Sequence, residues 1–136
     1  MLKFSFLFIL LTTQTWAKGS VMIEKVIQDY FQGYQQADTT LIKKSFHSNT
    51  RLLSVDQGKL DITEMSDWLK NLEERHLRGD IRKGKLSIET IDVTNETAIA
   101  KLKIRFDAFE FTDYLSLLKI SGRWIIVGKI YHFQKI

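Results

Sequence analysis

The 136-residue sequence contains no cysteine and no proline. Without cysteine the chain has no disulfide, no thiolate metal ligand and no cysteine nucleophile, so its stability has to come from packing. The three histidines are scattered without a His-x-x-x-His pair, and there is no glycine-rich phosphate loop or nucleophile elbow. The sequence therefore predicts no metal site and offers no motif for a bound cofactor.

A strong excess of charge of one sign is also missing. The chain has 20 basic and 16 acidic residues, a formal net charge of +4 at pH 7. The two signs are interspersed, which gives no reason to expect a nucleic-acid partner. The densest basic stretch, residues 75–85, is expected to form a solvated surface loop. Binding of an anionic lipid or envelope polymer there is the alternative.

No apolar run is long enough to span a bilayer, which takes about 18 or more residues. The apolar run from Phe4 to Leu11 follows a single positive charge at Lys3, and the segment ends at Ala17, a small residue of the kind that a signal peptidase accepts. This layout is typical of a secretory signal peptide cleaved after Ala17. We therefore expect residues 1–17 to be a signal peptide. Residues 18–136 are expected to form one exported domain, periplasmic or secreted, with no stable membrane insertion.

Helical periodicity dominates the first half of the remaining chain. Apolar residues at three- and four-residue steps predict a helix from Ser20, as its N-cap, to about Ala37. Asp38 is expected to cap a short second helix that ends near Phe46, and Thr63 a third. Short extended segments at 51–55 and 59–62 separate the second helix from the third.

The second half of the chain alternates as strands do. Residues 98–106 place apolar side chains on one face and basic ones on the other. A one-residue slip of phase near Glu89 and Thr90 predicts a β-bulge, and Ser121-Gly122 between two apolar runs is typical of a tight hairpin. Helices followed by antiparallel strands indicate an α+β fold. Because the last strands are apolar on both faces and the helices cover only one, we expect a homodimer through the outer sheet face.

Three segments carry a family resemblance: the stripe Tyr30-Phe31-x-x-Tyr34, the stretch from Asp38 to Phe46-His47, and the hairpin with Asp113-Tyr114-Leu115-Ser116-Leu117 and Gly122-Arg123-Trp124. With them, the chain resembles the nuclear transport factor 2-like (NTF2-like, SnoaL-like) superfamily, above all small bacterial proteins labelled putative lumazine-binding. The resemblance implies a cone in which three N-terminal helices pack on a strongly bent antiparallel sheet around a pocket, and it implies frequent dimers. Since the superfamily includes ketosteroid isomerase, scytalone dehydratase and many non-catalytic binding domains, it leaves the chemistry open.

Two residues are the candidates for catalysis. His47 lies where the resemblance places a histidine lining the cone, and an imidazole titrates near neutral pH, as an acid or base must. The alternative is a ring that only caps the helix end. Asp113 adjoins a dense aromatic set, where a partly desolvated carboxylate can act as a base. The alternative is a strand-end carboxylate paired with a cation on the rim. A hydrogen-bonded pair of His47 and Asp113 would suit proton abstraction or dehydration.

An interior rich in aromatic rings is the other predicted feature of the site. Such rings most often form only core, but around a cavity they suit a flat, mostly apolar ligand. Lys129 is expected at the cone mouth or at the dimer seam. The candidate ligand-binding residues are Tyr30, Tyr34, His47, Trp68, Phe111, Asp113, Trp124 and Tyr131.

These features predict an exported protein that binds a small hydrophobic or aromatic molecule without a cofactor. The alternative is a cofactor-independent isomerase, dehydratase or hydrolase that uses His47 and Asp113 as an acid/base pair. A dimeric interaction module without a working pocket is a third possibility. The ketosteroid isomerase pattern has a second acid deep in the pocket, and no residue here matches it convincingly. Binding is therefore favoured over catalysis.

Overall fold

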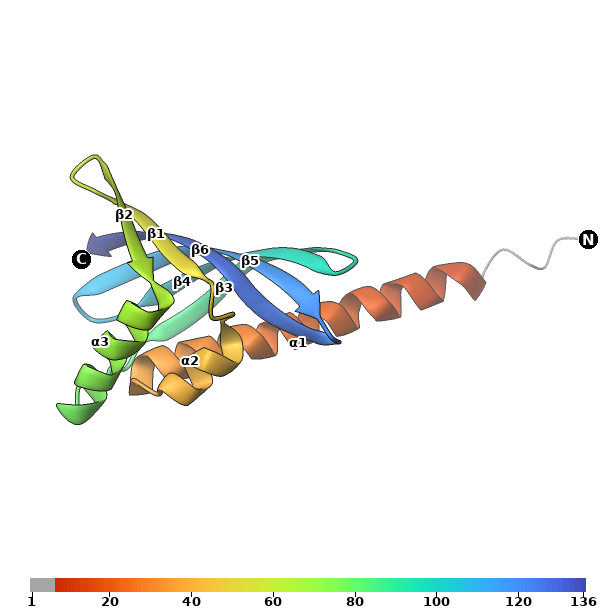
Figure 1. The fold of residues 1–136 in the computed structure, drawn as a ribbon. Helices are drawn as coiled ribbons and strands as arrows, with labels where there is room; N and C mark the ends of the chain where they lie inside the picture. The colour runs from red at the N-terminus through yellow and green to blue at the C-terminus, as the bar shows by residue number, and fades with distance from the viewer. Residues whose placement is uncertain (1–6) are drawn as a thin grey trace, which may run out of the picture.

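The computed structural model describes residues 7–136, with side chains from residue 18, so the first six residues of the predicted signal peptide lie outside the described residues. Three helices and six strands follow one another in an α+β arrangement (Figure 1). Their bounds are α1 Leu7–Gln36, α2 Thr39–Ser45, β1 Arg51–Asp56, β2 Lys59–Glu64, α3 Met65–Leu77, β3 Lys85–Thr94, β4 Thr97–Arg105, β5 Phe109–Ile120 and β6 Arg123–Lys135. The predicted α+β class is thereby confirmed.

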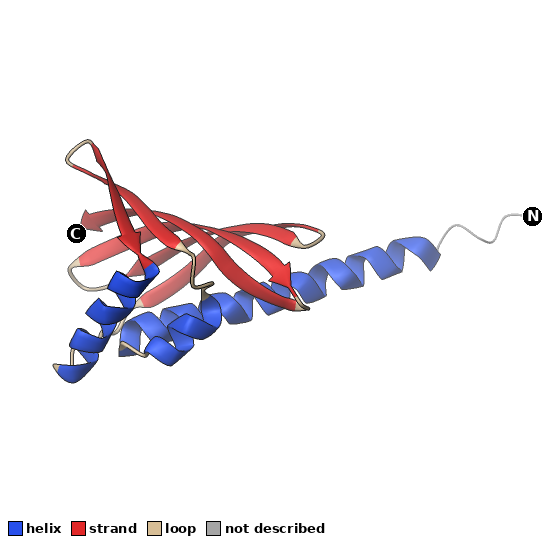
Figure 2. Ribbon diagram, in the orientation of Figure 1, coloured by secondary structure: helices blue, strands red, loops and turns tan. Residues whose placement is uncertain are grey.

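All six strands form one sheet in the order β2-β1-β6-β5-β4-β3. The helices lie on one side of this twisted sheet, as Figure 2 shows. The sheet is not wholly antiparallel, because β1 pairs in parallel with β6 through Leu52 and Lys129. The chain already runs alongside β6 in this direction just after α2, where Phe46 forms a parallel bridge with Ile126. The short connection from there to β1 preserves that direction.

Helix α1 begins earlier than the sequence pattern predicts. It spans Leu7–Gln36, so Ser20 lies inside the helix and is not its N-cap. The helix runs on past the edge of the sheet toward the N-terminus (Figure 1), and among its side chains described from residue 18 on, the first fully buried one is Ile23. Within residues 7–136, no helix combines the length and apolar character needed to cross a membrane.

Local signals in the sequence place several turns correctly. Asp38 accepts hydrogen bonds from the backbone N–H groups of Thr40 and Leu41 and so caps α2, as predicted. Ser121 and Gly122 have φ values of 50° and 77°, the left-handed pair that a tight two-residue hairpin requires. The register of β3 with β4 shifts between Ile88 and Thr90, which confirms the predicted bulge.

The predicted N-cap of the third helix, Thr63, is wrong by one residue, because the structure has Glu64 at that position. Strand β2 continues to Glu64 because each of its residues pairs with β1, up to Glu64 opposite Arg51. Thr63 therefore remains in the strand, and α3 begins at Met65 without a side-chain cap. Pairing with a neighbouring strand has outweighed the local capping signal.

The basic stretch 75–85 forms a largely exposed surface loop over residues 78–84, as its composition predicts, but not at its start. Arg75 lies on α3 with its side chain buried, and its guanidinium donates to the backbone carbonyls of Tyr34 and Asp80. Arg82 donates to the Tyr34 hydroxyl at 2.8 Å and pairs with the Asp80 carboxylate at 3.2 Å. We call Tyr34, Arg75, Asp80 and Arg82 the arginine cluster. It fixes the segment after α3 against the end of α1.

Candidate functional site

A second bulge, in β6, decides which side chains of this strand enter the cone. Opposite β5, Leu117 pairs with Ile126 and Ser116 pairs with Gly128, so Val127 is an extra residue. The extra residue shifts the alternation by one position. Ile126 and Lys129 consequently both face inward, three residues apart, and both are buried.

At the inner face of the sheet, Lys129 meets two other buried polar side chains. Its Nζ donates to the Tyr30 hydroxyl oxygen at 2.6 Å and lies 3.1 Å from Asp113 Oδ2. The Tyr30 hydroxyl in turn donates to Asp113 Oδ2 at 2.6 Å. Tyr30 comes from α1, Asp113 from the middle of β5 and Lys129 from β6. We call these three residues the Lys–Asp–Tyr centre; their exposed fractions are 1%, 0% and 6% for Tyr30, Asp113 and Lys129.

Aromatic rings surround the ammonium group of Lys129. Its Nζ lies 4.9 Å from the ring centroid of Tyr30, 5.0 Å from Tyr131, 5.5 Å from Trp68 and 5.8 Å from Phe111. Ring faces at such distances attract a cation, and more strongly once water is excluded. We call these four rings the ring cage. The cage supplies favourable contacts to a positive charge at a place that is otherwise dry.

Burial shifts the pKa values of Lys129 and Tyr30 in the centre. It lowers the pKa of Lys129, because the charged ammonium loses its hydration, while the nearby Asp113 carboxylate opposes this shift. Burial first, and then the Asp113 charge, raise the pKa of Tyr30 well above its ordinary value of 10.0. Tyr30 therefore stays protonated at neutral pH and acts as a hydrogen-bond donor to Asp113.

One atom of the centre has no partner. Asp113 Oδ1 is fully buried, and it accepts no hydrogen bond from any described residue. A buried acceptor left in this state costs about 1–3 kcal/mol. Native proteins rarely leave such atoms unpaired without a functional reason. The free oxygen belongs to the carboxylate that pairs with the caged Lys129 ammonium, and an added hydrogen-bond donor at Oδ1 would remove this cost.

Several of the candidate ligand-binding residues gather at this centre. Tyr30 and Asp113 belong to it, and Trp68, Phe111 and Tyr131 are rings of its cage. Tyr34 lies one helical turn beyond Tyr30 and contacts Phe111 edge to face, with 5.7 Å between the ring centroids. These six residues come from α1, α3, β5 and β6, and only the tertiary structure joins them.

His47 does not join this group. Its backbone N–H donates to the Ile126 carbonyl, and its Nδ1 accepts from the N–H of Asn49. No hydrogen bond links it to Asp113 within the described part of the chain. His47 lies beside Ile126, whereas Asp113 pairs with Tyr131. Ile126 and Tyr131 are five positions apart along β6, a distance of roughly 15 Å. The hydrogen-bonded dyad of His47 and Asp113 expected from the sequence therefore does not form.

Trp124 also lies away from the centre. It pairs with Lys119 near the hairpin, six residues along β5 from Asp113, or roughly 20 Å. Its ring is buried beside Met22 and Val26 of α1. At this position Trp124 belongs to the core at the end of the cone away from the Lys–Asp–Tyr centre. The expectation that Asp113 sits at a strand end is wrong as well, since β5 starts four residues earlier and Asp113 is wholly buried.

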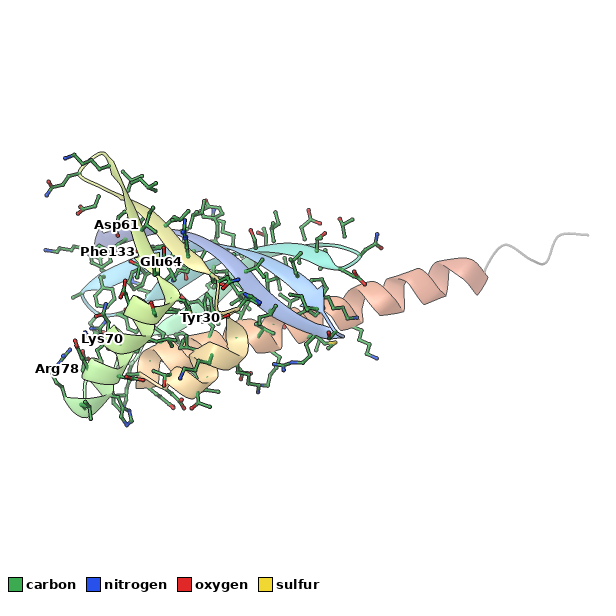
Figure 3. The ribbon with its side chains drawn as sticks, in the orientation of Figure 1. Tyr30, Asp61, Glu64, Lys70, Arg78 and Phe133 are labelled. Atoms are coloured by element: carbon green, nitrogen blue, oxygen red, sulfur yellow. The ribbon has the colours of Figure 1, made fainter. Side chains whose placement is uncertain are left out.

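From the centre, aromatic contacts lead toward the surface. Phe111 lies 5.9 Å from Tyr131 and 5.5 Å from Phe133, measured between ring centroids. Phe111 and Tyr131 are partly buried, and Phe133 is 45% exposed. Figure 3 labels Tyr30 on α1 and Phe133 near the end of β6. The rings thus form a continuous apolar row between the buried centre and the surface near α3.

Lys129 is the site residue that sequence reasoning did not assign. The alternation of Val127, Lys129 and Tyr131 does not show which face of the sheet Lys129 lies on. The answer depends on the bulge in β6, and Gly128 is the only sign of this bulge in the sequence. The usable signal is the unusual placement of a lysine between apolar runs of a strand. Among the described side chains, no group of three or more histidine, cysteine, aspartate or glutamate residues is arranged to hold a metal ion.

Known proteins with similar sequences identify the family. Residues 18–132 match the sequence profile of a family described as putative lumazine-binding. The chain belongs to this family. A curated relative, aldolase FrzH from Cladobotryum sp., is 29% identical over 108 residues, which cover 76% of this chain and 82% of that protein.

Solved structures of family-like proteins share the fold. An NTF2-like protein of unknown function from Shewanella baltica superposes with a TM-score of 0.78 at 28% identity, covering 88% of this chain and 96% of that one. NTF2-like proteins from Silicibacter pomeroyi and Methylobacillus flagellatus give TM-scores of 0.77 and 0.73 at 16% and 22% identity. They cover 87% and 86% of this chain, and 98% and 93% of their own lengths. This member of the putative lumazine-binding family thus has the NTF2-like fold, and its Lys–Asp–Tyr centre lies inside the cone.

Proposed function

We propose that the protein binds a flat, largely apolar small molecule in its cone and holds the polar end of that molecule at the Lys–Asp–Tyr centre. The observation that carries this proposal is the buried, unpartnered Oδ1 of Asp113, whose carboxylate pairs with the caged Lys129 ammonium. A hydroxyl or N–H of a ligand would donate to Oδ1, and a carbonyl oxygen would accept from Lys129. The rings would contact the apolar body of the ligand.

Entry to the centre requires movement, because Asp113 is completely buried. The partly exposed rings of Phe111, Tyr131 and Phe133 are the apolar surface that a ligand would meet first. α3 carries Trp68 and packs on α2 and on β2. A small shift of α3 with Trp68 would open the row of rings toward the centre.

The curated relative supports one ligand class. It is named an aldolase, and aldol chemistry acts on carbonyl compounds. A carbonyl oxygen also matches the Lys129 ammonium, which has three N–H groups and uses them on the Tyr30 hydroxyl oxygen and the Asp113 carboxylate, so that one is left for a ligand. For this chain we therefore propose a ligand with a carbonyl group attached to an aromatic or conjugated body.

Tryptophan fluorescence tests the pocket directly. Of the two tryptophans with described side chains, Trp68 belongs to the ring cage and Trp124 does not. Cinnamaldehyde, cinnamyl alcohol and lumazine serve as flat probes, titrated into the Trp124→Phe and Trp68→Phe variants of the full chain. Saturable quenching in Trp124→Phe and none in Trp68→Phe is the expected result. If all three probes fail to bind, the result favours the interaction-module alternative.

We also propose that the chain is exported after cleavage behind Ala17. The N-terminal charge and apolar run support this, and the first turns of α1 extend past the sheet (Figure 1). Cell fractionation followed by N-terminal sequencing would find a mature chain starting at Lys18 in the periplasm or medium. A chain that keeps residues 1–17 in the cytoplasmic fraction would contradict the proposal.

A second copy of the chain is the proposed partner of the outer sheet face. This face holds a groove of about 500 Å³ whose lining includes Leu53, Ile99, Tyr114 and Ile130. Three of these residues, Ile99, Tyr114 and Ile130, are exposed apolar side chains on neighbouring strands. Sedimentation velocity should give a dimer, and Ile99→Lys should convert it to monomer. Leu77→Lys, an exposed position on α3, is the control that should remain dimeric.

A further inference from the structure

We propose that Lys129 is a nucleophile that captures carbonyl compounds as a covalent imine inside the cone. This deepens the binding function proposed above and rests on it. The amine would attack the carbonyl carbon of the bound molecule, so that Lys129 would be a reacting group and not only a hydrogen-bond donor.

Geometry places proton-transfer groups directly beside the amine. Nζ of Lys129 lies 2.6 Å from the Tyr30 hydroxyl oxygen and 3.1 Å from Asp113 Oδ2. A lysine acts as a nucleophile only after it loses a proton, and a nearby base provides for this. The Asp113 carboxylate is the nearest carboxylate base, and the Tyr30 hydroxyl bridges the same two groups.

The surroundings favour an imine over a free ammonium in two ways. Burial lowers the pKa of Lys129, which raises the fraction of neutral amine. A protonated imine carries the same single positive charge as the ammonium that it replaces. The charge would keep its contacts with the ring cage and with Asp113, while a conjugated carbonyl compound would add ring contacts.

The step balances without an oxidant or reductant. Asp113 accepts a proton from the ammonium, and the neutral Nζ forms a C–N bond with the carbonyl carbon. The carbonyl π electrons move to oxygen, which takes one proton from the attacking nitrogen to give a neutral carbinolamine. The C–O bond then breaks, water leaves with the proton that Asp113 returns, and the nitrogen lone pair forms the C=N bond. One water is released, and the net charge does not change.

Other lysines of the sheet provide a contrast within the same molecule. Lys101 is partly exposed on β4 and pairs with the Glu89 carboxylate at 3.2 Å. The hydrogen bond and charge of Glu89 raise the pKa of Lys101, which keeps its amine protonated. Lys101 therefore reports the background reactivity of an ordinary surface lysine.

Borohydride trapping tests the proposal on the full wild-type chain. The protein is incubated with cinnamaldehyde, reduced with sodium cyanoborohydride and digested, and labelling of each lysine is measured by peptide mass spectrometry. We expect Lys129 to be labelled roughly tenfold faster than Lys101, as an activated lysine in a desolvated pocket should be. Lys129→Arg should remove only this label, and Lys101→Arg should leave it intact.

The possible outcomes distinguish a failure of the imine proposal from a failure of the proposed ligand binding. If Lys129 is labelled no faster than Lys101 while cinnamaldehyde still quenches Trp68, the imine is overturned and the pocket remains. If neither labelling nor quenching occurs, both proposals fail for this ligand class. Tyr30→Phe keeps the amine but removes its bridging hydroxyl, so labelling of Lys129 should slow severalfold with the fold intact by circular dichroism. Unchanged labelling there would overturn the assisted mechanism.

Discussion

Two clusters in this protein are built from the same residue types, one helical turn apart. Tyr30 and Tyr34 lie at i and i+4 on α1, and each hydroxyl contacts a basic side chain that is paired with an aspartate. In the Lys–Asp–Tyr centre the pair is Lys129 with Asp113, and in the arginine cluster it is Arg82 with Asp80. The two differ in how their polar groups are used.

The arginine cluster is anchored on backbone atoms. Arg75 donates to the carbonyls of Tyr34 and Asp80, and the Asp80 carboxylate is 32% exposed and reaches water. The Lys–Asp–Tyr centre has almost no solvent exposure, and one oxygen of Asp113 is unpartnered. Arg75 Nε is also buried without a hydrogen-bond partner, but it lies 3.4 Å from the Asp80 carboxylate. The arginine cluster therefore pairs its buried cation with a carboxylate that reaches water, whereas the buried centre leaves one acceptor free.

The largest expected effect is the loss of one charge from the buried centre. Lys129→Met should lower the free energy of unfolding by about 3–5 kcal/mol, because it leaves the Asp113 carboxylate buried without its cation. Removing both charges in Lys129→Met with Asp113→Leu should recover much of this loss. Denaturant unfolding measures each value. If Lys129→Met lowered the free energy of unfolding no more than Lys101→Met does, the buried pair would not be energetically coupled.

A smaller effect comes from the two tyrosines, which form a matched pair. Tyr30→Phe removes hydrogen bonds to a buried cation and a buried carboxylate, and should cost about 1.5–3 kcal/mol. Tyr34→Phe removes one bond to the partly exposed Arg82 and should cost about 0.5–1.5 kcal/mol. The same unfolding measurements apply to both. Equal losses would mean that burial does not separate the two clusters.

The smallest expected effect is the pH response of the arginine cluster. The hydrogen bond from Arg82 is the main reason that the pKa of Asp80 lies below its ordinary value of 3.8. A lowered pKa contributes stability above pH 3.8, and this stability is lost as the pH falls through the lowered value. Asp80→Asn should therefore be less stable than wild type at pH 7, by no more than about 1 kcal/mol. The difference in unfolding free energy between wild type and Asp80→Asn should disappear in acid, as unfolding curves at pH 7 and below pH 3 would show. A difference that does not change with pH would contradict this prediction.

Local patterns predict much of the fold because they depend on neighbours in the sequence. The cap at Asp38, the hairpin at Ser121-Gly122 and the bulge near Thr90 each follow from a few adjacent residues. The predicted N-caps at Ser20 and Thr63 are wrong because a longer helix and a strand pairing override them. The expected surface loop at 75–85 is found only in part, because Arg75 lies at the end of α3 and donates to the Tyr34 carbonyl on the distant helix α1.

The sequence by itself determined the α+β class, the apolar stripe of α1 and the presence of a set of aromatic rings, Tyr30 among them, in the interior. These depend on side-chain periodicity, which is local. Only the tertiary structure decided that Asp113 pairs with Lys129 and not with His47. A bulge in β6 turns Lys129 inward, and the strand register sets His47 far along the sheet. Register and bulges arise from contacts between strands, so the partner of a buried charge follows from how distant segments meet.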